Sequence, residues 1–248
     1  MKWLCLFILF THISFLSFAQ PFIHSHNDYD QPEPLTNALR NKAFTIEADV
    51  YLTGRGLLVA HDRKDLSTAN TLDSLYLQPI INLFSQHGGK ISEDSTYAAT
   101  LMIDIKDSGI VVIAELIKLL APYPSVFDRS VNAKAVQIVI SGSRGPVSRW
   151  AYYPSYIFFD GRPKEVYDNA TLQRVAFISD SYFNYIIIPD STNNHIEKLA
   201  QKVHDMGKTL RVWGIPDNPE SWKNMRELGV DIINTDKVAE CRNYFKKD

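Results

Sequence analysis

The chain has 248 residues, of which 45% are hydrophobic, and this is enough for one large folded domain with its own core. Its formal net charge is −2, so the sequence lacks the basic excess with which proteins bind nucleic acid. The composition therefore favours a globular protein whose partner is not a nucleic acid.

The N-terminal segment has the pattern of a secretory signal peptide. A basic residue near the start is followed by a mostly apolar run, and small residues stand at Ser17 and Ala19, the −3 and −1 positions of the expected cleavage site. The run is short for a bilayer span, so a retained anchor is the less favoured interpretation. We therefore expect a signal peptide over residues 1–19, a mature domain over residues 20–248, and a secreted or periplasmic protein.

Further along the chain, apolar strand patterns alternate with helical ones. The expected strands, in chain order, are residues 21–26, 44–52, 100–106, 135–141, 156–160, 185–189, 209–215 and 230–234, with a hairpin partner for the second strand at 57–61. The expected helices are residues 34–40, 72–86, 110–120 and 194–206, one through Trp222 and Met225, and one at the C-terminus. Repeated β-α order with apolar strands predicts a parallel sheet covered by helices. Eight strands in this length favour an α/β fold of the (β/α)8 TIM-barrel type, a single domain with a small hairpin insertion, over an open doubly wound sheet.

Pairs of charged residues occur on two neighbouring strands. Glu47 and Asp49 are separated by two, so both side chains point to the same side of the second strand. Two adjacent carboxylates in an apolar strand are costly unless a cation lies between them. The hairpin then leads back to His61, and the third strand carries Asp104 and Lys106 at the same spacing. Three carboxylates from adjacent strands predict a site for a divalent metal ion, Mg²⁺ or Ca²⁺.

Histidines stand at the ends of the strands where a barrel of this type has its chemistry. The first strand ends in His24-Ser25-His26, and His61 ends the hairpin. Histidines in such places can act as general base, nucleophile or general acid. His24 lies deeper in its strand, which favours a structural role for it.

Each of these residues also has a plainer interpretation. The Glu47–Asp49 pair can be rim carboxylates balanced by lysine or arginine, Asp104 and Lys106 a structural salt bridge, and His61 a packed histidine bonded to a carbonyl. Trp213, on the seventh strand, is as well placed for the barrel core as for a substrate surface. Arg144 and Arg162 are possible anion contacts, although surface arginines are the commoner outcome.

The motifs resemble the superfamily of glycerophosphodiester phosphodiesterase and phosphatidylinositol-phosphodiesterase barrels, including its sphingomyelinase D branch. Residues 47–62 follow the pattern Glu-x-Asp-Val…Thr…Gly…Val…His-Asp, and residues 101–106 are similar to the third-strand motif Ile-Glu/Asp-Ile-Lys. The segment 229–236 resembles the ending Gly-Val-Asp-Gly-Ile-x-Thr-Asp. The family's His-Arg-Gly start and Pro-Glu-Asn-Thr segment are absent, and His24-Ser-His-Asn-Asp-Tyr stands in their place, closer to sphingomyelinase D.

The resemblance implies a role for each matching residue. The implied metal ligands are Glu47, Asp49 and Asp104; the implied catalytic residues are His26 and His61; and the implied substrate contacts are Lys106, Trp213 and Asn27. It further implies an exported, metal-dependent phosphoric diester hydrolase acting on glycerophosphodiesters or phospholipid headgroups. Such a protein would contact a membrane surface only through its substrate.

Two other classes of protein remain as alternatives. The His24-Ser-His26 segment also resembles the His-x-His motif of amidohydrolase barrels, but those sites need further histidines, and the expected strands ending near Ser141, Asp160 and Pro189 supply none. The chain can also be a catalytically silent barrel that binds a phosphorylated ligand.

Overall fold

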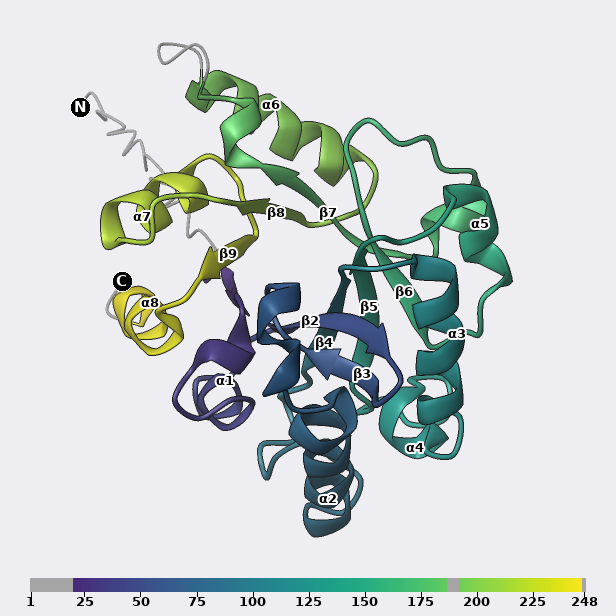
Figure 1. Ribbon diagram of the computed structural model, residues 1–248. Coiled ribbons are helices and arrows are strands. Elements are labelled where there is room, and N and C mark those ends of the chain that lie inside the picture. The colour runs from purple at the N-terminus through teal and green to yellow at the C-terminus, as the bar shows by residue number, and fades with distance from the viewer. Residues whose placement is uncertain (1–19, 187–191, 247–248) are drawn as a thin grey trace, which may run out of the picture.

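The computed structural model describes residues 20–186 and 192–246, so the expected signal peptide lies outside the described residues. The strands are β1 (Phe22–Ser25), β2 (Thr45–Thr53), β3 (Gly56–Val59), β4 (Thr100–Ile105), β5 (Gln137–Gly142), β6 (Ile157–Gly161), β7 (Val175–Ser181), β8 (Leu210–Trp213) and β9 (Ile232–Thr235). β1 pairs in parallel with both β9 and β2, so eight parallel strands close into a barrel (Figure 1). β3 is antiparallel to β2 and forms the predicted hairpin outside the closed ring.

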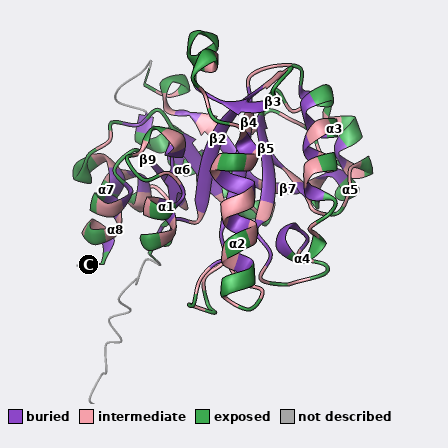
Figure 2. Ribbon diagram, turned by 60° about the horizontal axis from the view of Figure 1, so that its bottom comes forward, coloured by how far each residue is buried: buried purple, intermediate pink, exposed green. Residues whose placement is uncertain are grey.

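Helices surround this barrel. They are α1 (Thr36–Arg40), α2 (Gln78–Gln86), α3 (Gly109–Leu120), α4 (Pro124–Phe127), α5 (Asn169–Leu172), α6 (Thr192–Asp205), α7 (Pro219–Glu227) and α8 (Val238–Phe245). α3 shows why they pack there, because its buried residues Val112, Ile113, Leu116 and Leu120 recur at helical spacing. The buried strands and the exposed outer faces of the helices are visible in Figure 2. Within the described part of the chain, no helix has the length and apolar character needed to cross a membrane.

The predicted (β/α)8 barrel is confirmed, and seven of its eight strands lie where the sequence predicts them. The prediction for the sixth barrel strand is wrong. That strand is β7, whereas Tyr185 and Ile186 lie in a turn and residues 187–189 are not described. β7 was missed because its second half is polar: Ser179 accepts a hydrogen bond from Arg211, and the stronger apolar pattern lies further along the chain.

The barrel interior changes character along its axis. Toward the amino ends of the strands it holds an apolar cluster of Met102, Val139, Phe177 and Ile232. Two positions further along the same strands, on the same side of each strand, stand Asp104, Ser141, Ser179 and Asn234. The apolar layer thus closes one end of the barrel, and the polar layer begins the functional site at the carboxyl ends.

Candidate active site

The three predicted metal ligands converge. Asp49 of β2 lies directly opposite Asp104 of β4 in the parallel register, and Glu47 precedes Asp49 by two residues on the same side. One carboxylate oxygen from each of the three lies within 4.8 Å of the other two. Glu47 and Asp49 are buried. The geometry therefore provides an oxygen-rich cluster that suits a hard divalent cation.

A glycine of the neighbouring strand makes room for this cluster. Gly142, at the end of β5, has a φ of +65°, and a Cβ there would lie 2.6 Å from Asp104 Oδ1 and 2.5 Å from the carbonyl oxygen of Ile105. A side chain at this position would collide with the carboxylate and with the backbone of β4. Gly142 thus allows Asp104 to hold its position facing the cavity.

Lys106 is the only lysine in ion-pair contact with the cluster among the residues described. Its Nζ lies 3.0 Å from Asp49 Oδ2 and also donates to Asp104 Oδ2. Burial lowers the pKa of Lys106, but the carboxylates of Asp104 and Asp49 outweigh it and raise that pKa, so the ammonium stays charged. The salt bridge considered from the sequence is therefore present, but one ammonium does not balance three carboxylates.

Asp49 retains an unused ligand atom. Its Oδ2 accepts a hydrogen bond from the Tyr29 hydroxyl at 2.8 Å, whereas its buried Oδ1 has no hydrogen-bond partner in the described structure. Burial and the adjacent Glu47 carboxylate raise the pKa of Asp49, against the opposing effect of Lys106. A buried, unpaired carboxylate oxygen beside two further carboxylates fits a missing cation.

His26 is held by a carboxylate. Its Nδ1 lies 2.7 Å from Asp236 Oδ1, just beyond β9. Burial lowers the pKa of His26, but the hydrogen bond to Asp236 and the charge of Glu47 raise it above its usual value overall. With Nδ1 engaged, Nε2 is the nitrogen available to a ligand.

His61 approaches the cluster from the end of the hairpin. Its Nδ1 lies 3.0 Å from Asp49 Oδ2, and its side chain is 58% exposed. With Nδ1 in contact with Asp49, Nε2 is again the nitrogen available to a ligand. The plainer interpretation was a histidine bonded to a carbonyl. The structure shows the ring bonded to the Asp49 carboxylate instead.

His24 has a different environment from His26. It is fully buried, and its Nε2 lies 2.7 Å from Glu47 Oε2 and 2.8 Å from Arg211 Nη1. Burial and the charge of Arg211 lower the pKa of His24, so the ring is neutral. The metal-capable group found in the described residues consists of carboxylates alone, which argues against an amidohydrolase-like His-x-His site.

These side chains surround one cavity of about 330 Å³ at the carboxyl ends of the strands. Its lining is His26, Asn27, Glu47, His61, Asp104, Lys106, Ser141, Gly142, Arg162, Arg211 and Trp213. Every predicted site residue is in that lining except Asp49, which is fully buried. Asn27 adopts a left-handed backbone conformation directly after His26, and Trp213 is partly exposed rather than part of the core.

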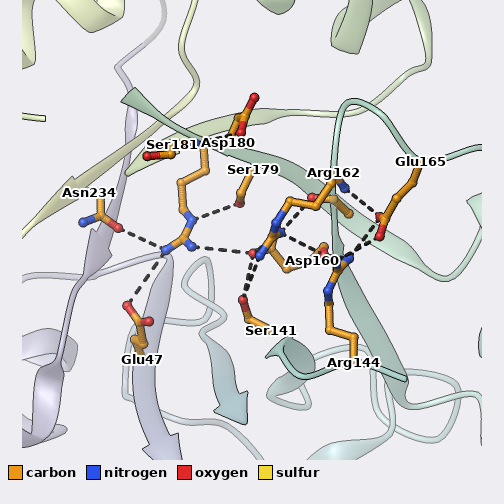
Figure 3. A network of polar contacts seen from close by, with 12 residues as sticks. Glu47, Ser141, Arg144, Asp160, Arg162, Glu165, Ser179, Asp180, Ser181 and Asn234 are labelled. Carbon is orange, nitrogen blue, oxygen red and sulfur yellow. Dashed lines mark hydrogen bonds and ion pairs between the residues drawn. The ribbon is translucent and has the colours of Figure 1, made fainter. Parts of the chain in front are cut away.

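The sequence interpretation missed an arginine network on the opposite wall of the cavity (Figure 3). The buried Asp160 accepts from Ser141 Oγ at 3.0 Å, and its Oδ2 lies 2.9 Å from Arg162 Nη1 and 3.5 Å from Arg211 Nη2. Burial alone would raise the pKa of Asp160, but Arg162 and Arg211 lower it, so the carboxylate stays ionised.

Arg211 is the least expected member of this network. It is 4% exposed, and it donates to Ser179 Oγ and to Asn234 Oδ1, each at 3.0 Å. One signal was present in the sequence, because Arg211 precedes Trp213 by two on the same strand and must share its side. Arg144 also belongs to this network, since it donates to the backbone carbonyl of Asp160 at 2.7 Å and to Glu165, but it is not part of the cavity lining (Figure 3).

The sequence of this (β/α)8 barrel matches models of phosphodiesterase families. Residues 17–160, more than half of the chain, match the family model described as the AIM6-like phosphodiesterase domain. Residues 209–239 match the glycerophosphoryl diester phosphodiesterase family. The chain belongs to the AIM6-like phosphodiesterase domain family, which confirms the resemblance drawn from its motifs.

Relatives of known sequence are named for altered inheritance of mitochondria. The chain is 25% identical to "Altered inheritance of mitochondria protein 6 homolog" of Arthroderma benhamiae, over 90% of this chain and 83% of that protein. It is 26% identical to "Altered inheritance of mitochondria protein 6" of Eremothecium gossypii, over 90% of this chain and 69% of that protein.

Solved structures share the fold. A glycerophosphodiester phosphodiesterase from Parabacteroides distasonis aligns with a TM-score of 0.56 at 14% identity, covering 92% of this chain and 97% of that one. Another, from Agrobacterium tumefaciens, aligns with a TM-score of 0.51 at 14% identity, covering 90% and 98%. At this identity the likeness concerns the barrel alone.

Proposed function

We propose that this protein is an exported, metal-dependent phosphodiesterase that acts on glycerophosphodiesters or phospholipid headgroups. The observation that carries the proposal is the convergence of Glu47, Asp49 and Asp104 within 4.8 Å, beside a cavity also lined by His26 and His61. Family membership supports the reaction class, and the pattern of residues 1–19 supports export.

Glu47, Asp49 and Asp104 would hold the divalent ion. When bound, the ion would supply positive charge that attracts a phosphate oxygen and offsets negative charge in the transition state. Four carboxylates of the site, the three ligands and Asp160, are opposed by only three cationic side chains, Lys106, Arg162 and Arg211. A divalent ion would reverse this deficit and leave one positive charge, which a singly charged phosphodiester matches.

His26 is assigned the role of general acid. Its raised pKa keeps the imidazole protonated to higher pH, and Asp236 fixes its orientation through Nδ1. From Nε2 it would give a proton to the oxygen of the departing alcohol.

His61 is assigned the opposite role. Asp49 accepts from its Nδ1, so the Nε2 lone pair can take a proton from the attacking hydroxyl or attack phosphorus itself. If the attacking hydroxyl belongs to the substrate, the product is a cyclic phosphate, and if it belongs to water, the product is a phosphomonoester.

The donors of the cavity would bind the phosphate oxygens. Lys106 lines the cavity at the end of β4. Arg162, which is ion-paired with Asp160, lines it at the end of β6. Charged donors held in a partly enclosed site stabilise anionic oxygens more strongly than donors in water.

The experiment is a phosphodiester panel assayed with Mg²⁺ or Ca²⁺ and again with a chelator. The panel contains bis-p-nitrophenyl phosphate, glycerophosphocholine, glycerophosphoinositol, sphingomyelin and lysophospholipids, and ³¹P NMR separates cyclic from open products. We expect chelator-sensitive turnover of at least one substrate and its loss in His61→Gln. No turnover from any of them would sink the proposal, and ligand binding without turnover would favour the silent barrel.

A further inference from the structure

A second cavity lies at the opposite end of the barrel from the candidate active site. Its volume is about 390 Å³, within the range of cavities that hold small molecules. It lies at the amino ends of neighbouring strands, since Phe22 begins β1, Phe44 precedes β2 and Ala98 precedes β4. In the described part of the chain no carboxylate lines it, and its lining includes three cations and three aromatic rings: Lys42, Arg129, Arg242, Phe22, Phe44 and Tyr97.

Arg242 of α8 brings a charge to this cavity without a carboxylate to balance it among the described residues. It donates from Nε to the carbonyl of Asn41 at 2.9 Å and from Nη2 to the carbonyl of Lys42 at 2.7 Å. Burial lowers the pKa of Arg242, but a guanidinium stays protonated in a protein. A charged group whose hydrogen bonds go to neutral carbonyls therefore lines the cavity.

Arg129, on the connection between α4 and β5, repeats this arrangement. It donates from Nε to the carbonyl of Ala135 at 3.0 Å and from Nη2 to the carbonyl of Ala99 at 3.2 Å, and its Nη1 donates to Gln137 Oε1 at 3.4 Å. All three acceptors are neutral, and they use three of the five N–H donors of the guanidinium. Burial lowers the pKa of Arg129 as well.

The third cation is already balanced. Lys42 forms an ion pair with Asp94, which does not line the cavity. The two arginines thus leave two positive charges in the cavity, each partly buried. Partly buried charges are stabilised by a counterion that also accepts their hydrogen bonds.

Aromatic rings form the apolar part of the lining. Phe22 and Phe44 stack with their ring centroids 4.4 Å apart, and Phe44 packs on the apolar cluster inside the amino end of the barrel. The Tyr97 hydroxyl donates to the carbonyl of Ala43 at 2.6 Å, which fixes that ring. Phe22 remains 44% exposed, so an apolar ring surface is available beside the arginines.

We propose that this cavity binds a small organic anion, whose carboxylate or phosphate group is bound by Arg129 and Arg242 and whose apolar part packs on Phe22. The planar fork of a guanidinium matches the paired oxygens of both kinds of anion. Burial of the exposed ring would add to the affinity. The carboxylate cluster lies at the other end of the barrel, so this ligand is distinct from the proposed phosphodiester substrate and needs no metal ion.

The test is a titration of the purified protein followed by two-dimensional amide NMR spectra in chelator. The amides of Thr96 and Ala98 report on this cavity, and those of Asn27 and Gly142 report on the candidate active site. Phenyl phosphate and benzoate carry both a ring and an anion, whereas inorganic phosphate and benzyl alcohol carry only one of the two. We expect saturable shifts at Thr96 and Ala98, with at least one ring-bearing anion binding about tenfold or more tightly than either partial probe.

Matched variants separate ligand binding from a merely structural role of the arginines. Arg174 also lies at the amino ends of the strands, is partly buried and donates to the backbone carbonyls of Ser155 and Tyr153, but it does not line the cavity. We expect Arg242→Met to weaken binding by about tenfold or more, the loss of a charge-assisted hydrogen bond, and Arg174→Met to leave it unchanged.

A variant of the exposed ring keeps the test decisive if Arg242→Met does not fold. We expect Phe22→Ser to weaken binding of the ring-bearing anion to the level of inorganic phosphate. Saturable shifts confined to Asn27 and Gly142, no saturable shift with any probe, or equal affinities in Arg242→Met and Arg174→Met would overturn the proposal. Because the readout does not use turnover, the outcome is independent of the function proposed above.

Discussion

The two halves of the catalytic face have opposite electrostatic character. The half formed by β1, β2 and β4 holds Glu47, Asp49 and Asp104 against a single ammonium, and it leaves a buried carboxylate oxygen unpaired. In the half formed by β5 to β9, Arg162 and Arg211 both pair with Oδ2 of Asp160, although its buried Oδ1, like that of Asp49, has no hydrogen-bond partner in the described structure. The first half therefore has an excess of carboxylates and is incomplete without a cation, whereas in the second half two arginines outweigh Asp160 and present positive charge to an anion.

The largest effect should come from the incomplete half. We expect Asp104→Asn to lower metal-dependent turnover by about 10⁴-fold, because a ligand of the ion contributes several kcal/mol to the transition state. The matched control is Asp180→Asn, a carboxylate that binds Asn184 and Tyr185 at the rim of the other half. We expect Asp180→Asn to change turnover by about twofold or less. Similar losses of turnover in both variants would contradict the claim that the two halves differ.

The next effect distinguishes the two histidines. We expect His26→Gln to lower turnover of glycerophosphodiesters by about 10³-fold, the contribution of a positioned acid. The loss should be much smaller with bis-p-nitrophenyl phosphate, since p-nitrophenolate leaves without a proton. His61→Gln should impair both substrates alike. If both variants depended on the leaving group to the same extent, the assignment of His26 as the acid and His61 as the base would be contradicted.

The half formed by β5 to β9 should show its effect in stability. Arg211→Met leaves Asp160 buried with one cationic partner fewer, and we expect the free energy of unfolding to fall by about 3 kcal/mol. Urea denaturation measures it, with the exposed Arg149→Met as control. Adding Asp160→Asn should recover part of the lost stability. An unchanged unfolding midpoint in Arg211→Met would show that the Arg211–Asp160 pair does not contribute to the stability of the fold.

The smallest expected effect is a shift in pH dependence. Asp236 raises the pKa of His26, so Asp236→Asn should lower that pKa while an amide oxygen can still orient the ring. Because the protonated form is the acid, turnover should then be lost at lower pH on the alkaline side and change little on the acid side. A profile of kcat/KM against pH measures this, and an alkaline limb that stays in place would contradict the role of Asp236.

The same contrast explains which features could be predicted from the sequence. The first half has local signals: Glu47 and Asp49 are spaced for one side of a strand, and Asp104 repeats the pattern on the next strand. The second half is assembled from single residues on β5 to β9, each unremarkable in its own segment. The sequence therefore marked Arg162 only as a possible anion contact, with a surface position as the commoner outcome, and the structure places it in the cavity lining.

The missed strand has the same cause. β7 carries Ser179 toward the barrel interior, where its hydroxyl meets Arg211 of β8. A strand that serves a polar interior loses apolar residues, so its periodic signal weakens at the point where the site is built. The apolar run further along the chain has a stronger pattern, which is why the strand was expected there.

By itself, the sequence determined the alternation of strands and helices, and hence the barrel, together with the residues of the carboxylate cluster. Those features depend on short-range periodicity, since residues two apart in a strand share a side wherever the strand lies. Only the tertiary structure decided that Arg211 lies buried beside His24 and that Asp160 binds two arginines. These arrangements join segments far apart along the chain, and closure of the barrel is what brings them together.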